Sequence, residues 1–220
     1  MKTVKVPLAQ IIVDETLYPR HKVSAGNVAL LKEALRSGAT LPPVVLDAKT
    51  KKVIDGWHRI EAVRSLYGEG VEVDAELRDY DTKQDMVYDA VHLNAVQGYK
   101  LTTWDRVRSI VLLTELDADE ERIQRALGIT KEKLDKLMLR IADGPHGVKV
   151  PLKGSMRDFG GQKITAAQER YNAESAPGLS IHVMLAQIIR ALEAKAVNLH
   201  DERISEQFRR IIELWEGFAA

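Results

Sequence analysis

The sequence predicts an α+β protein in which a small mixed sheet is followed by a region made only of helices. Residues 4–80 show the order strand, helix, strand, strand, helix, strand, judged from apolar alternation and from helical spacing. Beyond residue 80 only the helical spacing recurs. We therefore expect a compact sheet domain at residues 1–80, a helical region at 81–143, and a basic connector with two C-terminal helices at 144–220.

Composition is that of an ordinary globular protein and excludes several kinds of chemistry. Of 220 residues, 45% are hydrophobic and 29% charged, with 32 basic and 32 acidic side chains in balance. Cysteine is absent, which excludes disulfides, zinc–thiolate sites and thiol catalysis. No apolar run is long enough to cross a membrane, and the chain does not open on a secretory signal, so we expect a cytoplasmic protein.

The elements of the sheet domain follow from local patterns. Residues 4–13 are expected to form a short strand, and Ser24 to cap a helix that runs to about Ser37. Residues 44–46 and 52–55 indicate two strands of a hairpin. Apolar and charged side chains alternate over 71–77, which predicts a half-buried strand.

The most informative stretch is Val53 to Ala62, where a strand turns sharply into a helix. Asp55-Gly56 frees the backbone for that corner, and His58 and Arg59 follow in the first helical turn. The unpaired N–H groups and the dipole of a first turn favour an anion, so a bound phosphate explains an arginine there. The alternative is a tight turn whose arginine is solvated.

The run Asp55-Gly56-x-His58-Arg59-x-x-Ala62 resembles the phosphate-binding motif of the ParB/sulfiredoxin superfamily. Pro19-Arg20 is similar to a Pro-Arg of ParB proteins whose arginine faces a nucleotide. Asn94 matches an asparagine that, in ParB proteins, helps to hold a magnesium-bound triphosphate. The resemblance implies a ParB-like core that binds a nucleoside triphosphate, CTP or ATP, with Mg²⁺ at Asn94 as its only metal candidate. The implied binding residues are Arg20, Asp55, Gly56, Trp57, His58, Arg59 and Asn94.

The sequence departs from the ParB pattern around Asn94. Leu93 replaces a glutamate and the arginine of the motif is missing, while Gln97 and Gly98 are closer to a variant form found in ParB-like regulators. These departures weaken the expectation of metal-dependent hydrolysis more than that of phosphate binding. Sulfiredoxin activity is excluded, because Trp57 stands where that enzyme needs its cysteine.

The helical region carries a candidate DNA-binding unit. Thr82 and Thr102 are expected to cap two helices, and residues 119–140 then show the apolar spacing of a helix-turn-helix with Gly128 at its turn. The second helix, residues 131–140, presents basic side chains suited to DNA: Lys131, Lys133, Lys136 and Arg140. The alternative is a helical pair with a solvated charged face.

The last third of the chain contains a connector and two amphipathic helices. Five basic and two acidic residues lie between 144 and 170, so this segment is either a second phosphate-contacting segment or a linker. Residues 181–195 and 201–216 each repeat apolar side chains at i, i+4, i+7 and i+11. Two such helices bury little surface alone, so we expect them to hold a homodimer or, alternatively, to dock on the body of their own chain.

Taken with the resemblance, these features favour a ParB-like DNA-binding protein with a nucleotide as ligand or switch, acting in DNA segregation or transcription control. One alternative is an enzyme on the same fold: an NTPase (CTPase or ATPase), a nucleotide-dependent phosphotransferase or a nuclease, with Asp55 and His58 as the catalytic candidates. Another is a helical adaptor whose core has lost its ligand. The expected partners are DNA, a nucleotide and a second copy of the chain, with no membrane.

Overall fold

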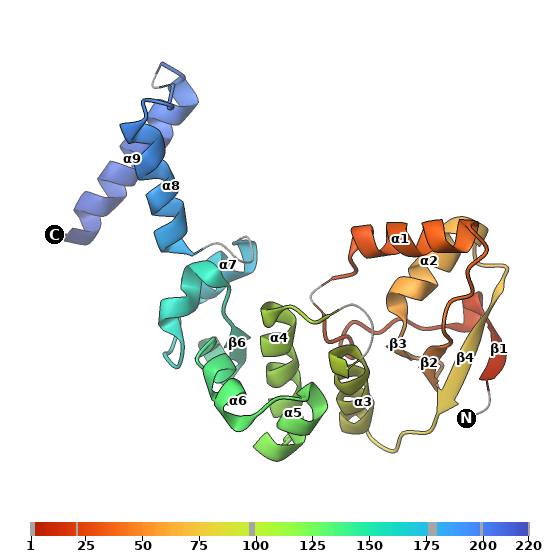
Figure 1. Ribbon diagram of the computed structural model, residues 1–220. Coiled ribbons are helices and arrows are strands. Elements are labelled where there is room, and N and C mark those ends of the chain that lie inside the picture. The colour runs from red at the N-terminus through yellow and green to blue at the C-terminus, as the bar shows by residue number, and fades with distance from the viewer. Residues whose placement is uncertain (1–2, 21, 97–99, 176–179, 199, 220) are drawn as a thin grey trace.

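The computed structural model describes residues 3–20, 22–96, 100–175, 180–198 and 200–219 (Figure 1). The motif positions Gln97 and Gly98 lie outside these residues. A small mixed sheet and its two helices form one end of the molecule, and the remaining helices continue from it (Figure 1). The expected α+β class is confirmed.

The sheet has the strand order β1-β4-β2-β3. Its central pair, β4 and β2, is parallel, and the two outer pairs are antiparallel. The strands are β1 (Thr3–Pro7), β2 (Val44–Asp47), β3 (Val53–Asp55) and β4 (Glu72–Arg78). Helices α1 (Ala25–Arg36) and α2 (Trp57–Tyr67) pack on each other beside the sheet (Figure 1). Ile60 and Ala62 of α2 are fully buried, as are Leu46 and Ala75 in the strands.

The first strand is shorter than the sequence predicts. It ends at Pro7, and a short 3₁₀ helix, η1 (Leu8–Gln10), follows. Proline has no backbone N–H to continue a strand ladder. Only Ile12, which bridges Lys52, regains pairing with the sheet in the expected range 8–13.

Four helices follow the sheet and share a core with it. They are α3 (Lys83–Val96), α4 (Thr103–Thr114), α5 (Glu120–Leu127) and α6 (Lys131–Met138). Leu17, Val45 and Ile54 of the sheet region belong to the same buried cluster as the inner faces of these helices. The sheet and the helical region are therefore joined by continuous apolar packing.

The predicted helix caps are present. Thr82 accepts a hydrogen bond from the N–H of Asp85, and Thr102 forms a reciprocal capping box with Asp105. Gly128 ends α5 with a φ of 59°, a conformation that favours glycine, and Thr130 caps α6. The second helix ends at Met138 rather than at Arg140, so Arg140 lies beyond it.

The segment after α6, which the sequence predicted to be a connector, contains regular secondary structure. A two-stranded antiparallel sheet, β5 (Ile141–Asp143) and β6 (Lys149–Pro151), encloses the short turn η2 (Pro145–Gly147). A 3₁₀ helix, η3 (Gly154–Phe159), and α7 (Ala166–Glu174) follow. The unit has a small core of its own, made of Ala142, Val150, Leu152, Met156 and Ile164. Strands of three residues are too short to show a clear period, which explains why the sequence did not predict them.

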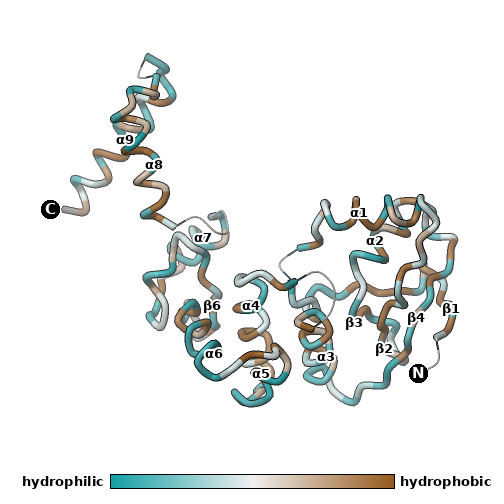
Figure 2. The backbone as a smooth tube through the Cα atoms, viewed as in Figure 1, coloured by the Kyte–Doolittle hydropathy of each residue, from teal (hydrophilic) through white to brown (hydrophobic). Residues whose placement is uncertain are grey.

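Helices α8 (Ile181–Glu193) and α9 (Glu202–Ala219) project away from the rest of the chain (Figure 1). Their apolar side chains remain exposed: Ile181, Leu185, Ile188, Leu192, Ile211 and Trp215. Trp215, the largest of them, is 73% exposed. Figure 2 shows the apolar character of α8. These two helices therefore do not dock their stripes on the body of their own chain. None of the helices within the described ranges has both the length and the apolar character of a membrane span.

Candidate ligand-binding cleft

A cleft of about 900 Å³ lies where the sheet domain, α4 and the unit after α6 meet. It is rich in positive charge, because among the described residues five lysines or arginines line it against one carboxylate, Asp105. The five are Arg20, Lys22, Arg140, Lys153 and Arg157. Its size is that of ordinary small-molecule sites. The arrangement suits a ligand with several negative charges.

Three helices begin at this cleft. The cap residues Ser24 of α1, Thr102 of α4 and Ser180 of α8 all line it. Each cap side chain accepts one hydrogen bond from its own helix, but further N–H groups of the first turn have no partner within the helix. The three helix dipoles add partial positive charge to that of the side chains.

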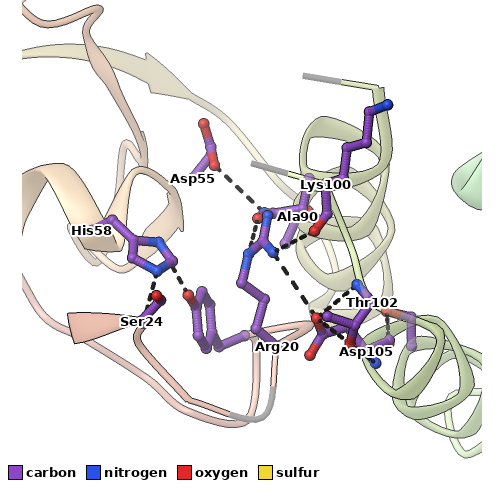
Figure 3. Close-up of polar contacts among 11 residues, drawn as sticks. Arg20, Ser24, Asp55, His58, Ala90, Lys100, Thr102 and Asp105 are labelled. Carbon is purple, nitrogen blue, oxygen red and sulfur yellow. Dashed lines mark hydrogen bonds and ion pairs between the residues drawn. The ribbon is translucent and has the colours of Figure 1, made fainter. Parts of the chain in front are cut away.

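Arg20 occupies the inner end of the cleft and is only 5% exposed. Its Nε donates to Oδ1 of Asn94 at 3.1 Å, and Nη1 donates to the carbonyl oxygen of Lys100 at 3.4 Å (Figure 3). Oδ2 of Asp105 lies 4.0 Å from the same Nη1. The guanidinium is therefore fixed between α3 and the start of α4, as the stick view shows (Figure 3).

The network continues from Asn94 to the Asp-Gly corner. The Nδ2 of Asn94 donates to the carbonyl oxygen of Ala90 at 2.9 Å and to Oδ1 of Asp55 at 3.4 Å. The other carboxylate oxygen of Asp55 accepts from Nη2 of Arg59 at 2.6 Å. One chain of contacts thus joins Arg20, Asn94, Asp55 and Arg59, which come from three separate motifs of the sequence.

Trp57 and Arg59, two of the ligand-binding residues that the motif implied, do not line this cleft. Arg59 lies over Gly56 and lines a smaller cavity of about 280 Å³. Trp57 lines a groove between α1 and α2, where its Nε1 donates to Glu61 at 3.1 Å. Successive helical residues point about 100° apart, so of these three neighbours only His58 faces the cleft.

Gly56 makes the approach of Arg59 possible. Its φ of 106° is in the region that favours glycine. A Cβ at this position would lie 2.7 Å from Nη2 of Arg59 and 2.7 Å from a methyl carbon of Val44. The glycine of the motif therefore serves the packing of the corner, and it does not line the cleft.

His58 is a buried neutral imidazole that ties α2 to the start of α1. The backbone N–H of Ser24 donates to its Nε2 at 3.0 Å, so the ring proton resides on Nδ1, 3.4 Å from the hydroxyl of Tyr18 (Figure 3). Burial and the nearby Arg20 lower the pKa of His58 below its ordinary value. Burial raises the pKa of the Tyr18 hydroxyl, which therefore stays protonated.

The two catalytic candidates are engaged in the scaffold. Both ring nitrogens of His58 face hydrogen-bond partners, and each carboxylate oxygen of Asp55 accepts a hydrogen bond. A general base needs a free lone pair within reach of the proton that it removes. The lone pair on Nε2 of His58 is occupied by the Ser24 N–H in this arrangement, whereas each Asp55 oxygen accepts one hydrogen bond and retains a further lone pair.

Asn94 does not fit a Mg²⁺ ligand. Its amide oxygen accepts from the Arg20 guanidinium, so an ion bound there would lie beside a permanent positive charge. Within the described ranges, no group of three or more histidine and carboxylate side chains is placed to hold a metal. The geometry supports Asn94 as a positioning residue for Arg20.

The four residues assigned to DNA do not share one environment. Lys133 and Lys136 are exposed on α6, whereas Lys131 is held by Glu120 at 2.6 Å and lies 3.7 Å from Asp135. These contacts raise the pKa of Lys131. Arg140 lines the cleft instead of the helix surface, because α6 ends before it.

Lys22, Trp104 and Arg157 line the cleft, although the sequence did not single them out as site residues. Lys22 follows the Pro-Arg pair, Trp104 lies in the first turn of α4, and Arg157 lies in η3. The only signal for Arg157 was the basic bias of residues 144–170. Nothing local marks Lys22 or Trp104, since only the fold brings them to the same cleft.

No protein-family model matches the sequence, and no curated protein does. Solved structures of ParB proteins are similar to it at low identity. The C-terminally truncated chromosome-partitioning protein ParB from Caulobacter crescentus, complexed to the centromeric parS site, is 15% identical with a TM-score of 0.46. That alignment covers 62% of this chain and 70% of the ParB chain.

Two further structures are similar in the same way. The truncated Caulobacter ParB complexed with CTP-γ-S is 16% identical with a TM-score of 0.38, covering 63% of this chain and 78% of that one. A Pnob8-like ParB-N domain is 17% identical with a TM-score of 0.42, covering 68% of this chain. This chain spans 57% of the length of the Pnob8-like one.

Proposed function

We propose that this chain is a ParB-like DNA-binding protein whose cleft binds a nucleoside triphosphate as a ligand or switch, acting in the cytoplasm in DNA segregation or transcription control. The observation that carries the proposal is the cationic cleft itself. Arg20 is fixed at its inner end by Asn94, while Lys22, Arg140 and Arg157 line the rest of it. A fixed guanidinium among helix starts is a suitable site for a phosphate.

The cleft also has an apolar part suited to a base. Val23, Trp104, Val107 and Leu152 line it beside the charged groups. A nucleotide matches this division, because its base is flat and largely apolar on its faces while its phosphates are anionic. Sites for small ligands combine apolar lining with a few well-placed polar groups in this way.

Calorimetric titration tests the proposal. The full chain is titrated with CTP, ATP, GTP and UTP, each with and without Mg²⁺, and with the matching nucleosides as controls. We expect saturable binding of at least one triphosphate and none of its nucleoside. Binding without Mg²⁺ would agree with the engagement of Asn94 by Arg20. Failure of all four triphosphates to bind would refute the proposal.

DNA binding is assigned to the surface of α6. Lys133 and Lys136 are exposed there, and a recognition helix needs accessible cations that reach phosphates and base edges. A second copy of the chain is assigned to the exposed stripes of α8 and α9, because paired recognition helices read two half-sites in a symmetric dimer.

An enzymatic role remains the alternative, and one observation bears on the choice between the two. Asp55 and His58 are already hydrogen-bonded within the scaffold, which supports a ligand or switch over a hydrolase or nuclease. Release of inorganic phosphate from the bound triphosphate, measured with DNA present, tests this choice. Turnover that Asp55→Asn abolishes would favour the enzyme.

A further inference from the structure

One side of the cleft is formed by residues between 140 and 157, which overlap the basic segment 144–170 that the sequence offered as either a second phosphate-contacting segment or a linker. Arg140 follows α6, and Arg157 lies in η3. Helix α6 and strand β6 both pack against α4, whose first turn is part of the cleft (Figure 1). The Leu152 N–H donates to the Arg140 carbonyl at 2.8 Å, so the backbone carrying Arg140 is joined to the segment that leads into η3.

Several contacts hold this segment in place. Leu152 and Met156 belong to its small apolar core. Between them, the Lys153 ammonium donates to the carbonyl oxygens of Ala173 and Ser175 at 2.5 and 2.6 Å, and the Lys153 N–H donates to Asn172 at 2.8 Å. The Lys153 ammonium thus donates hydrogen bonds to carbonyl groups at the end of α7, which have no partner within the helix. The main role of the Lys153 side chain is therefore to hold the segment in place, and its contribution to the positive charge of the cleft is smaller.

Arg140, Arg157 and Lys22 supply much of the positive charge of the cleft. In the described ranges, none of these three forms an ion pair with an acidic side chain. Arg20, by contrast, faces Asp105. Arginines that line a cleft without an acidic partner can donate charge-assisted hydrogen bonds to the phosphates of an anionic ligand.

We propose that Arg140 and Arg157 bind the polyphosphate chain of the ligand from the α6–β6 side of the cleft. This inference rests on the proposed function and specifies it further. A ligand with several phosphates suits the site, because Arg20, Arg140 and Arg157 are three separate cations that line the same cleft of about 900 Å³. The segment at 141–174 is therefore part of the binding site.

The test compares two pairs of substitutions in the full chain. In the first, Arg140→Gln with Arg157→Gln removes both charges while keeping most of the side-chain stems. The matched control is Lys163→Ala with Arg170→Ala, which removes two charges from exposed residues of the same unit that do not line the cleft. Melting curves establish that both variants are folded.

The probes are CTP and ATP, inorganic tripolyphosphate, and CMP. We expect the Arg140/Arg157 variant to bind tripolyphosphate and the triphosphates about 10- to 100-fold more weakly, the scale expected when charge-assisted hydrogen bonds are removed. Affinity for CMP should change less, and the control should bind like wild type. If the Gln pair does not fold, Arg140→Lys with Arg157→Lys, which keeps the charge but loses the bidentate geometry, should show a smaller loss.

Three results would overturn the inference. If a folded Arg140/Arg157 variant binds tripolyphosphate with wild-type affinity, the two arginines do not bind the polyphosphate chain. The proposed function would remain intact. An equal loss in the Lys163/Arg170 control would show a general charge effect. Retained triphosphate affinity with weakened binding of a duplex DNA would assign the two arginines to nucleic acid instead.

Discussion

Arg20 and Asn94 lie 74 residues apart in the chain, and the Nε of the arginine donates a buried 3.1 Å hydrogen bond to Oδ1 of the asparagine. Asn94 fixes the arginine in one orientation and uses its own amide nitrogen to reach Asp55. The contact therefore links the cleft to the Asp-Gly corner, although Arg59 at that corner lies outside the cleft.

Substitutions of Arg20, which lines the cleft, and of Arg59, which lies at the Asp-Gly corner, test which of the two places binds the phosphate. Arg20→Ala should weaken triphosphate binding by roughly 1.5–3 kcal/mol, since it removes a charge-assisted hydrogen-bond donor. Arg59→Gln, which removes a guanidinium bound to Asp55, should leave the affinity nearly unchanged. Calorimetry on both folded variants measures this. Equal losses would instead put the phosphate at the corner, as the motif alone implied.

Trp104 should contribute to recognition of the base. Its side chain lines the cleft near the charged groups, and stacking of a base on an aromatic ring contributes about 1–3 kcal/mol. Trp104→Ala should weaken nucleoside triphosphate binding by that amount and leave inorganic tripolyphosphate binding as it is. Trp104→Phe should recover much of the loss. A matching loss for tripolyphosphate would show damage to the cleft rather than removal of a stacking partner.

The surface of α6 should dominate DNA affinity. Lys133→Ala with Lys136→Ala should weaken binding to duplex DNA and lower the slope of log K against log salt by about one for each phosphate that the variant no longer neutralises. Lys131→Ala should have less effect, because Glu120 and Asp135 already compensate that charge. Fluorescence anisotropy over a salt series measures both quantities. An unchanged slope in the double variant would make α5 and α6 purely structural.

The exposed stripes of α8 and α9 should hold a homodimer. Burial of Trp215 in such an interface contributes apolar surface that an isolated chain leaves 73% exposed. Truncating a large aromatic in a packed core typically costs about 3–5 kcal/mol, so Trp215→Ala should shift the protein toward monomer without unfolding the sheet domain. Light scattering over a concentration series is the measurement. A wild-type monomer at every concentration contradicts the dimer.

Acid should loosen the link between α2 and α1. Because burial lowers the pKa of His58 in the folded state, the unfolded chain binds more protons below the ordinary histidine pKa of about 6.5. Stability therefore falls as the pH drops through that value toward the lowered one. His58→Gln removes the titrating group and should reduce the difference in melting temperature measured about one pH unit either side of 6.5. An unchanged difference would assign the acid sensitivity to other groups.

Much of the fold follows from patterns of short range. The caps at Ser24, Thr102 and Thr130 and the end of α5 at Gly128 depend on residues within three or four positions, so the sequence alone predicts them. Strands β5 and β6 and the 3₁₀ helix η3 escaped prediction because single apolar residues between glycines and lysines stabilise them. The order of this segment depends on long-range contacts, such as that of Lys153 with Asn172.

The candidate site was predictable only in part, for a related reason. Arg20, His58 and Asn94 were expected together, and the structure brings them together. The directions of Trp57 and Arg59 were not predictable, because they depend on the rotation of α2 against its neighbours. Arg140 was expected on the DNA surface, and the early end of α6 turns it into the cleft.

The contacts of the Lys153 ammonium with Ala173 and Ser175 also determine how this lysine reacts. Its side chain is buried, whereas Lys149 and Lys163 in the same unit are exposed. Mild acetylation of the folded protein should therefore block trypsin cleavage after the two exposed lysines and spare cleavage after Lys153. A peptide that ends at Lys153 then marks an intact α7 end, and its disappearance in a variant shows that this unit has opened.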